Sequence, residues 1–330
     1  PDELEDKIEA LIYDRADAID LPVGEGGGKK IYCSSGTRDY IDFIKRTTDM
    51  EFNGLKVALD CANGASYQTA PTIFKELGAE VSVINAQPNG VNINANCGSV
   101  HPEGLRQFVL DIGADIGLAF DGDADRLIAV DEQGNIVDGD QIMAICGADL
   151  KERGALARDT IVATVMSNLG FDIAMDKVGC DVVKTQVGDR YVLEKMLECG
   201  YNFGGEQSGH IIFLDHNTTG DGSLTAVQLA SSIKRQGHSL SKLASVMKRL
   251  PQVLVNVEAD EETKKIYVNN RDIQAAIEEI ETKLNGRGRV LIRRSGTEPL
   301  IRIMIEGEDQ REIDMYANNL ADLFKSKFQR

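Results

Sequence analysis

The sequence predicts an α/β protein in which two related α/β domains, each with a mixed sheet, precede a smaller α+β domain at the C-terminus. Three observations predict this fold. The pattern of strand, polar turn, helix and strand occurs at residues 55–84 and again at 160–183, so two similar units follow one another. An acidic loop separates two apolar runs at 116–120 and 127–130. After Leu250 the chain alternates between half-exposed strands and amphipathic helices.

Composition and charge narrow the class of protein. A chain of 330 residues with 42% hydrophobic residues is ordinary for a globular α/β protein of roughly two to four domains. The formal net charge of −17 argues against nucleic acid or an anionic membrane as the main partner. No run approaches the ~18 apolar residues of a membrane span.

The cysteines predict the compartment. All 6 stand singly, in no spacing that suits zinc, and we therefore expect reduced thiols in a cytoplasmic protein. Cys97 lies in a polar stretch rich in glycine and asparagine, and it is the cysteine that we expect to be exposed.

Residues 1–38 do not have the pattern of a domain. Apolar residues recur at helical spacing from Leu4 to Ile12, but a glycine-rich segment at 23–28 follows, and this region offers the helix nothing to pack on. We interpret 1–38 as the remnant of a missing N-terminal domain together with a linker.

Three domains are expected to follow. The first, residues 39–135, is expected to contain a strand at 55–59, a helix at 69–77, a strand at 80–84 and the acidic loop between its two strands. The second, residues 136–250, is expected to contain a helix at 138–150, a strand at 161–165, a helix at 171–177 and a strand at 181–183. The third, residues 251–330, is expected to contain strands at 253–257 and 301–305 and helices at 273–284 and 313–328.

Asp121, Asp123 and Asp125 carry the strongest chemical signal. On a strand the outer two carboxylates would stand ~13 Å apart, and on a helix residues two apart do not face each other, so only a tight loop brings all three together. Three oxygen donors gathered in this way suit Mg²⁺, with a solvated acidic turn as the alternative. An EF-hand is excluded because Arg126 occupies the position that requires glycine. Arg126 can instead bind a phosphate or a carboxylate.

Residues 204–210 form a polar turn directly before an apolar strand, and the polar side chains of this turn are those of Glu206, Gln207, Ser208 and His210. The glycines are expected to let a ligand approach the backbone closely, while the carboxylate and the hydroxyl can bond to sugar hydroxyls or to an amine. The imidazole can move protons. A hairpin turn with a structural histidine is the alternative.

A further loop at 186–191 follows a predicted strand and contains Asp189 and Arg190. Loops after parallel strands meet at one edge of an α/β sheet, so these two side chains would line the same cleft as residues 204–210. The alternative is that they pair with each other at the start of a helix.

Residues 293–299 end one strand and open the next. Arginines, hydroxyls and free backbone amides around a glycine form a cradle for phosphate, because the fork of an arginine matches pairs of phosphate oxygens. The residues concerned are Arg293, Arg294, Ser295, Gly296 and Thr297. Arg302 faces away from Ile301 and Ile303, so it either supports Glu298 or reaches the ligand. A surface turn with loosely held arginines is the alternative.

The order of the motifs D-G-D-x-D-R, V-G-D-R-Y-V, G-E-x-S-G-H and R-x-S-G-T-E-P resembles the α-D-phosphohexomutase family, and the match covers nearly the whole chain. The segments at 88–94, 188–191 and 218–222 are most similar to the bacterial branch that interconverts glucosamine 6-phosphate and glucosamine 1-phosphate on the way to UDP-N-acetylglucosamine and the cell wall. The resemblance implies an isomerase whose α/β domains are the family's second and third. A phosphoglucomutase or phosphomannomutase of the same family, and a sugar-phosphate-binding module without turnover, are the alternatives.

The resemblance also implies roles for residues. Asp121, Asp123 and Asp125 would bind one Mg²⁺ ion, and a glucose or glucosamine 1,6-bisphosphate would act as primer. Glu206, Gln207 and Ser208 would hold the sugar, and the phosphate that does not react would be held by Arg293, Ser295, Gly296, Thr297 and Arg302. The residues assigned to catalysis are Arg126, Asp189, Arg190 and His210, of which His210 occupies a family position suspected of proton transfer. The expected partner is a small sugar phosphate, with a homodimer left open.

The chain departs from the family pattern in one respect. The family's first domain carries a T-A-S-H-N-P-type loop whose phosphoserine donates the phosphoryl group and completes the metal site, and no such segment occurs in this sequence. Ser34 and Ser35 are the nearest serines, but they lack the neighbouring histidine, asparagine and proline. We therefore expect this chain to be inactive as a mutase on its own.

Overall fold

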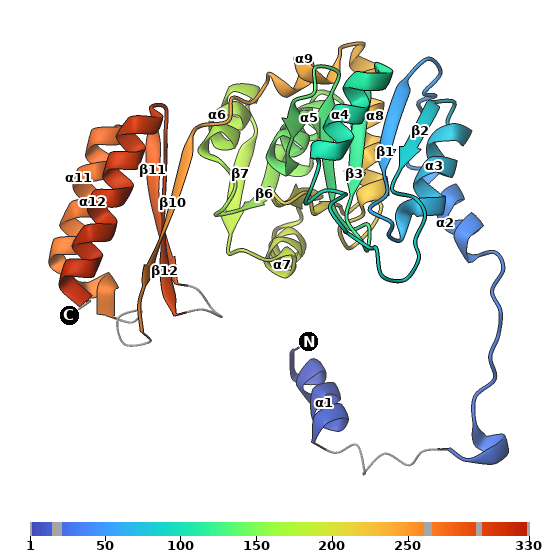
Figure 1. Cartoon of the computed structure of the whole chain (residues 1–330), viewed down its shortest axis with the longest axis horizontal. Coiled ribbons are helices and arrows are strands. Elements are labelled where there is room, and N and C mark those ends of the chain that lie inside the picture. The colour runs from blue at the N-terminus through green and yellow to red at the C-terminus, as the bar shows by residue number, and fades with distance from the viewer. Residues whose placement is uncertain (1, 15–21, 261–265, 295–298, 329–330) are drawn as a thin grey trace. The chain divides into compact units, whose positions relative to one another are not determined.

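A computed structural model describes residues 2–14, 22–260, 266–294 and 299–328. The chain divides into one unit of Pro1–Asp39 and a second of Tyr40–Arg330. In the first unit the predicted helix is present as α1 (Asp2–Tyr13), and one turn of 3-10 helix, η2 (Gly24–Gly26), follows it (Figure 1). The apolar side chains of α1 that repeat at helical spacing are exposed, namely those of Leu4, Ile8, Leu11 and Ile12.

The second unit contains three sheets, of which the first has five strands in the order β2-β1-β3-β4-β5. These strands are β1 (Lys56–Asp60), β2 (Glu80–Ile84), β3 (Ile116–Phe120), β4 (Leu127–Asp131) and β5 (Ile136–Val137). The helices connected with them are α2 (Gly36–Lys45), α3 (Ser66–Glu76) and α4 (Glu103–Ile112). The central strand β1 pairs in parallel with both β2 and β3, whereas the short loop after β3 makes β3 and β4 antiparallel, so the sheet is mixed as predicted.

The second sheet has the order β7-β6-β8-β9 and repeats this plan, with three parallel strands and one antiparallel strand. Its strands are β6 (Thr160–Thr164), β7 (Asp181–Thr185), β8 (Phe203–Gly205) and β9 (Ile211–Phe213). Its helices are α5 (Gly139–Glu152), η3 (Ala157–Asp159), α6 (Leu169–Val178), α7 (Asp189–Cys199), α8 (Gly222–Gln236) and α9 (Leu240–Ala244). The two predicted α/β units are therefore both present.

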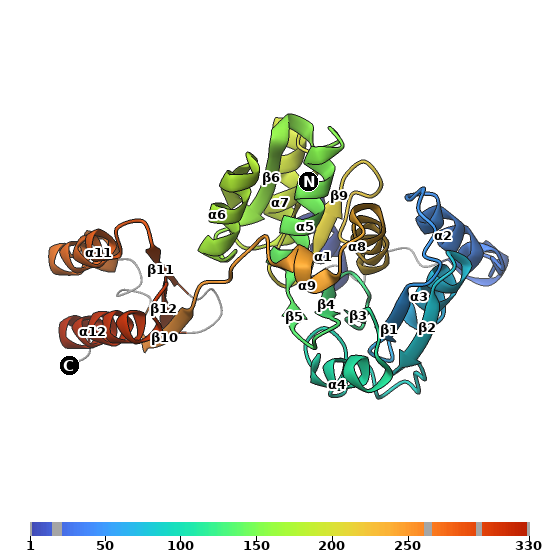
Figure 2. The ribbon, with the colours of Figure 1, turned by 90° about the horizontal axis from the view of Figure 1, so that it is seen from above.

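The third sheet is antiparallel, with the order β10-β12-β11. Its strands are β10 (Gln252–Glu258), β11 (Gly288–Arg294) and β12 (Leu300–Gly307), and its helices are η4 (Tyr267–Asn269), α11 (Arg271–Leu284) and α12 (Gln310–Phe328). Figures 1 and 2 show α11 and α12 side by side along one face of this sheet. Helices on one side of an antiparallel sheet make the α+β layer that the sequence predicted. Within the described part of the chain, no helix is both long enough and apolar enough to span a bilayer.

The first two sheets share a continuous hydrophobic core, whereas the third has its own. The helices α5 and α8 build much of the shared core, because most of their residues are buried. A helix that is buried all round must be covered on every side, and α8 contacts elements of both sheets, including β4 and β9. The loops at the edges of these two sheets are thereby held by one packed interior.

The expectation for Cys97 is wrong. Its side chain is 2% exposed, and the exposed cysteine is Cys33. The polar stretch around Cys97 folds back on β1, where the buried carboxylate of Asp60 accepts a hydrogen bond from the Gly98 N–H at 2.9 Å. A polar sequence became buried because the backbone groups of this loop find partners inside the protein.

Candidate active site

The candidate residues of the first two sheets lie on or next to loops that follow parallel strands. The loop after β3 carries the three aspartates, and the loops after β6, β7 and β8 begin at Val165, Gln186 and Glu206. The carboxyl ends of parallel strands meet at one edge of a sheet, where α/β proteins gather binding and catalytic groups. This is the edge at which the sequence predicted the site.

Asp121, Asp123 and Asp125 converge in the tight loop that their spacing requires. Each offers a carboxylate oxygen, and these oxygens all lie within 4.8 Å of one another. The Asp121 carboxylate accepts the Arg126 N–H at 3.0 Å, which closes the loop. Ala124 has a left-handed backbone with a φ of 65°, a strained conformation for a residue with a β-carbon.

The electrostatics of this loop fit a divalent cation. Burial, followed by the neighbouring Asp125 and Asp123 carboxylates, raises the pKa of Asp121 to about 7. Oδ1 of Asp125 is buried and, among the described residues, has no hydrogen-bond partner. Crowded carboxylates with an unsatisfied oxygen are the donor set that Mg²⁺ prefers.

Backbone contacts hold the loop from three neighbouring segments. The Ala65 N–H donates to the Gly122 carbonyl at 2.8 Å, the Leu127 N–H donates to the Gly209 carbonyl at 3.1 Å, and the Gly222 N–H donates to the Ala124 carbonyl at 2.8 Å. A β-carbon at Gly64, Gly209 or Gly222 would overlap a backbone carbonyl of the aspartate loop or of the β4 residue that follows it. The sequence did not reveal this set of backbone contacts, because its only local sign is glycine in polar turns.

The segment that contributes Gly222 is itself anchored. Asp221 caps α8 by accepting the Leu224 N–H at 3.0 Å. The same carboxylate accepts the Tyr40 hydroxyl, with distances of 2.9 and 3.0 Å to its two oxygens. Asp221 therefore fixes the start of α8 against the aspartate loop, a role that the sequence did not indicate.

His210 lies between two carboxylates. Its Nε2 is 3.5 Å from Asp125 Oδ2 and 3.7 Å from Asp189 Oδ2. The imidazole is 4% exposed, and its Nδ1 is buried without a hydrogen-bond partner among the described residues. Its backbone pairs with that of Arg126, which brings the turn after β8 against the aspartate loop. An imidazole in this position can accept and return a proton at Nε2.

Asp189 and Arg190 both begin α7, so the helix start of the alternative is present, but the pairing that it expected between these two described residues is not among their contacts. The two side chains differ in what they contact. Asp189 faces His210, whereas Arg190 forms an ion pair with Glu194 one turn along the helix, at 2.9 Å. The structure thus brings Asp189 to the candidate site, whereas Arg190 forms this ion pair within its own helix.

The turn 206–208 lines a cavity of about 370 Å³. Its walls are formed by Arg126, Thr164, Met166, Val187, Glu206, Gln207 and Ser208. The volume far exceeds the ~15 Å³ that one water needs, so a larger ligand can enter. Glu206 also accepts the Gly188 N–H at 3.1 Å, which ties this turn to the loop after β7. Gln207 Nε2 is buried and, among the described residues, has no partner.

The glycines of this turn do not have the expected purpose. Gly209 has a φ of +93°, and a β-carbon there would overlap the Leu127 carbonyl, so the close approach is to β4. The expectation that these glycines let a ligand approach is therefore wrong for Gly209, and a β-carbon at Gly205 would likewise overlap a protein backbone carbonyl, that of His210. Their small size lets two protein segments pack, while Glu206, Gln207 and Ser208 face the cavity.

Arg293 and Arg302 are directly opposed on β11 and β12. Both line a depression together with Met166 and Met304, so Arg302 shares the face of Arg293. Arg294 faces the other side, where its guanidinium lies 6.0 Å from the centre of the Tyr267 ring. The other predicted members of the phosphate cradle, Ser295, Gly296 and Thr297, lie outside the described residues, as does Glu298.

Family models match most of the chain. They are described as phosphoglucomutase/phosphomannomutase alpha/beta/alpha domain II at residues 38–134, alpha/beta/alpha domain III at 138–250 and C-terminal domain at 254–323. The chain therefore belongs to the phosphohexomutase family, whose members are isomerases. Among its relatives, the phosphoglucosamine mutase of Clostridium novyi (strain NT) is 57% identical over 326 residues, which are 99% of this chain and 73% of the relative.

Solved structures support the fold. A phosphoglucomutase/phosphomannomutase family protein from Burkholderia thailandensis matches 97% of this chain and 70% of its own, with a TM-score of 0.75 and 22% identity. Aspergillus fumigatus N-acetylphosphoglucosamine mutase in complex with GlcNAc-6P and magnesium matches 92% and 68%, with a TM-score of 0.72 and 20% identity. A structure of a serine-to-alanine variant of that enzyme with glucose 1,6-bisphosphate matches 89% and 64%, with a TM-score of 0.65 and 20% identity.

Proposed function

We propose that this chain carries the metal, sugar and distal-phosphate sites of a phosphoglucosamine mutase, which interconverts glucosamine 6-phosphate and glucosamine 1-phosphate. The supporting observation is that the aspartate loop, the buried His210 and the polar turn 206–208 meet at one edge of the two sheets. In this proposal residues 39–135 hold the metal, 136–250 the sugar and 251–330 the phosphate that does not react, while 1–38 belong to an N-terminal domain and linker. The likeness to phosphoglucosamine mutases supports the choice of substrate.

The proposed roles follow from the side chains. Asp121, Asp123 and Asp125 would hold one Mg²⁺ ion, which neutralises charge on the transferring phosphoryl group. His210 moves a proton at Nε2 to or from the sugar hydroxyl, and Asp189 orients the imidazole. The aligned magnesium complex of the Aspergillus enzyme supports this choice of ion. The complex of its serine-to-alanine variant with glucose 1,6-bisphosphate supports a bisphosphate primer.

The cavity residues would select and place the sugar. Glu206, Gln207 and Ser208 offer a carboxylate, an unpartnered amide and a hydroxyl, which together can bond to hydroxyls and to an amine at the second carbon. Arg293 and Arg302 hold the distal phosphate on β11 and β12. A separate place for the distal phosphate lets two isomers bind in opposite orientations, so positioning can supply much of the catalysis.

Calorimetric titration with Mg²⁺ and glucosamine 6-phosphate tests this proposal. Arg293→Ala should weaken glucosamine 6-phosphate binding by about 2 to 4 kcal/mol, because it removes a charged hydrogen bond to the phosphate. Arg294→Ala, on the opposite face of the same strand, is the matched control and should change little. Equal losses at both positions would contradict the phosphate cradle. Tighter binding of glucose, mannose or N-acetylglucosamine 6-phosphate would contradict the choice of sugar.

A further inference from the structure

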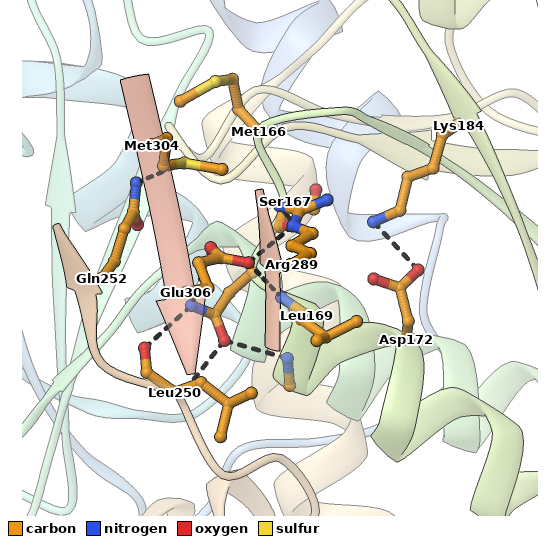
Figure 3. A network of polar contacts seen from close by, with 12 residues as sticks. Met166, Ser167, Leu169, Asp172, Lys184, Leu250, Gln252, Arg289, Met304 and Glu306 are labelled. Carbon is orange, nitrogen blue, oxygen red and sulfur yellow. Dashed lines mark hydrogen bonds and ion pairs between the residues drawn. The ribbon is translucent and has the colours of Figure 1, made fainter. Parts of the chain in front are cut away.

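A buried polar network joins the second α/β domain to the C-terminal sheet (Figure 3). At its centre is Glu306 of β12, whose side chain is 0% exposed. Figure 3 shows Glu306 directed at Leu169, where α6 begins, and at Arg289 on β11. A fully buried carboxylate is costly unless its oxygens are well satisfied, so this contact calls for an explanation.

Both oxygens of Glu306 accept hydrogen bonds. Oε1 accepts from Asn168 Nδ2 at 3.2 Å, and Oε2 accepts from the Leu169 N–H at 3.0 Å and from Arg289 Nε at 2.7 Å. The Leu169 N–H belongs to the first turn of α6, where the helix dipole also favours a negative charge. One charged group of the C-terminal sheet is thus fastened to a helix of the preceding domain.

Asn168 and Arg289 extend the network to the connecting segment. Asn168 donates to the Leu250 carbonyl at 3.0 Å and accepts the Leu250 N–H at 2.9 Å, directly before β10. Arg289 Nη2 donates to the Ser167 carbonyl at 2.7 Å. The Gly307 N–H donates to the Pro251 carbonyl at 3.1 Å. The chain that connects the two domains is therefore held from both sides.

The fastened loop borders both binding regions. Met166, next to Ser167, lines the cavity of Glu206 and also the depression of Arg293 and Arg302. Arg293 lies on the strand of Arg289, and Arg302 lies on the strand of Glu306. The network therefore lies beside both the sugar cavity and the depression of Arg293 and Arg302. A ligand that must reach both regions at once is sensitive to the distance between them.

We propose that Glu306 is a positioning residue that, through Arg289 and Asn168, holds Arg293 and Arg302 at the distance from the sugar cavity that a sugar phosphate requires. This inference rests on the proposed function and assigns to it a residue that touches neither the sugar nor the phosphate. Both oxygens of Glu306 have to accept hydrogen bonds, because each of their partners is a donor. Glutamine at this position would direct its NH₂ group at a donor in either amide orientation.

The test compares Glu306→Gln and Arg289→Lys with the unchanged chain. Lysine cannot reproduce the two directed contacts that Arg289 makes with Glu306 and Ser167, so the second variant loosens the network without removing the carboxylate. The control is Glu308→Gln, since Glu308 is 54% exposed and its ion pair with Arg287 measures 3.7 Å. Hydrogen exchange followed by mass spectrometry reports the network, and calorimetry reports Mg²⁺ and glucosamine 6-phosphate binding.

Faster exchange is expected in both variants at 167–170, 248–251 and 305–307, and at none of these segments in the control. The dissociation constant for glucosamine 6-phosphate should rise at least about tenfold. A tenfold rise corresponds to a protein in which about a tenth of the molecules have the arrangement that binds the ligand. The dissociation constant for Mg²⁺ should stay within about twofold of its value in the unchanged chain, because the aspartate loop belongs to the core of the first two sheets and not to that of the third. A general loss of structure would change this constant as well.

The two ways of failing are distinct. Unchanged sugar-phosphate affinity in variants whose exchange is faster would overturn the positioning role and leave the proposed function intact. Unchanged exchange in both variants would likewise overturn the inference, because the network would then not depend on this carboxylate. If the unchanged chain bound no glucosamine 6-phosphate, the proposed function itself would fail and the inference with it.

Discussion

Replacing Asp140 by asparagine should remove a pH dependence of stability that originates in α5. Asp140 is 0% exposed, and its carboxylate accepts the Asn168 N–H at 2.8 Å. Burial raises the pKa of Asp140 to about 7, with Asp138 adding to the shift and Asn168, Ser167 and Lys184 opposing it. Asparagine keeps an oxygen for the Asn168 N–H and has no charge to bury.

The magnitude follows from the difference between the folded and unfolded protein. The pKa of Asp140 is about 7 when folded and 3.8 in its ordinary state. Between these values the folded protein holds a proton that the unfolded chain has lost, so the free energy of unfolding falls as pH rises. At 1.36 kcal/mol per pKa unit, the loss from pH 4 to pH 8 is roughly 4 kcal/mol. The Asp140→Asn variant does not lose this stability, so its free energy of unfolding increases relative to that of the unchanged protein as pH rises.

Urea unfolding at pH values from 4 to 8 measures this difference in the free energy of unfolding. Circular dichroism is the appropriate signal, because the sequence contains no tryptophan. The free energy of unfolding of Asp140→Asn minus that of the unchanged chain should rise through the window and level off above pH 7. Subtracting the two curves removes the contributions of groups that titrate alike in both proteins. A difference that does not vary with pH would refute the reasoning, because Asp140 would then titrate equally in the folded and unfolded states.

Three further predictions concern the site. Asp123→Asn should abolish most Mg²⁺ affinity and raise the thermal midpoint of the metal-free protein by relieving carboxylate repulsion, which calorimetry measures; unchanged affinity would remove Asp123 from the ligands. Gly209→Ala should cost on the order of 1 to 3 kcal/mol of stability and weaken Mg²⁺ binding, because a β-carbon would overlap the Leu127 carbonyl; normal Mg²⁺ binding would show that the contact does not shape the loop. The 330-residue chain should bind glucosamine 6-phosphate without converting it, because its sequence has no T-A-S-H-N-P-type loop. Turnover by a preparation shown to contain no other mutase would contradict this prediction and would make Ser34 and Ser35 the next residues to test.

The sequence was informative wherever a pattern is local. Alternating apolar residues, polar turns after strands and the D-x-D-x-D spacing each depend on neighbours along the chain, and they predicted the sheets and the aspartate loop. It was uninformative where distant segments meet. Glu306 follows the alternating isoleucines of 301–305, and nothing in this local pattern indicates that its side chain is buried. It is buried because α6, more than 130 positions earlier in the chain, begins against it.

The contact between Tyr40 and Asp221 was hidden for the same reason, since 181 positions separate the two residues. Glycine patterns were ambiguous in a different way. A glycine in a polar turn permits a close approach, but the sequence does not state what approaches. At Gly209 the approaching group is the backbone of β4, and at Gly222 it is the carbonyl of Arg126. Both glycines therefore belong to the packing between the first two sheets.

These contacts explain how three carboxylates remain close together before any cation arrives. Mutual repulsion would open a free loop, and burial adds to the cost of keeping the charges, as the raised pKa of Asp121 shows. The backbone donors of Ala65, Leu127 and Gly222 fix the segments on both sides, and each depends on a glycine that lets two backbones approach. Because the shared core forms these contacts during folding, binding a cation does not have to supply the ordering of the loop. A divalent ion would relieve the repulsion between these carboxylates, so the contacts that hold the three side chains together would also raise the affinity of the loop for the ion.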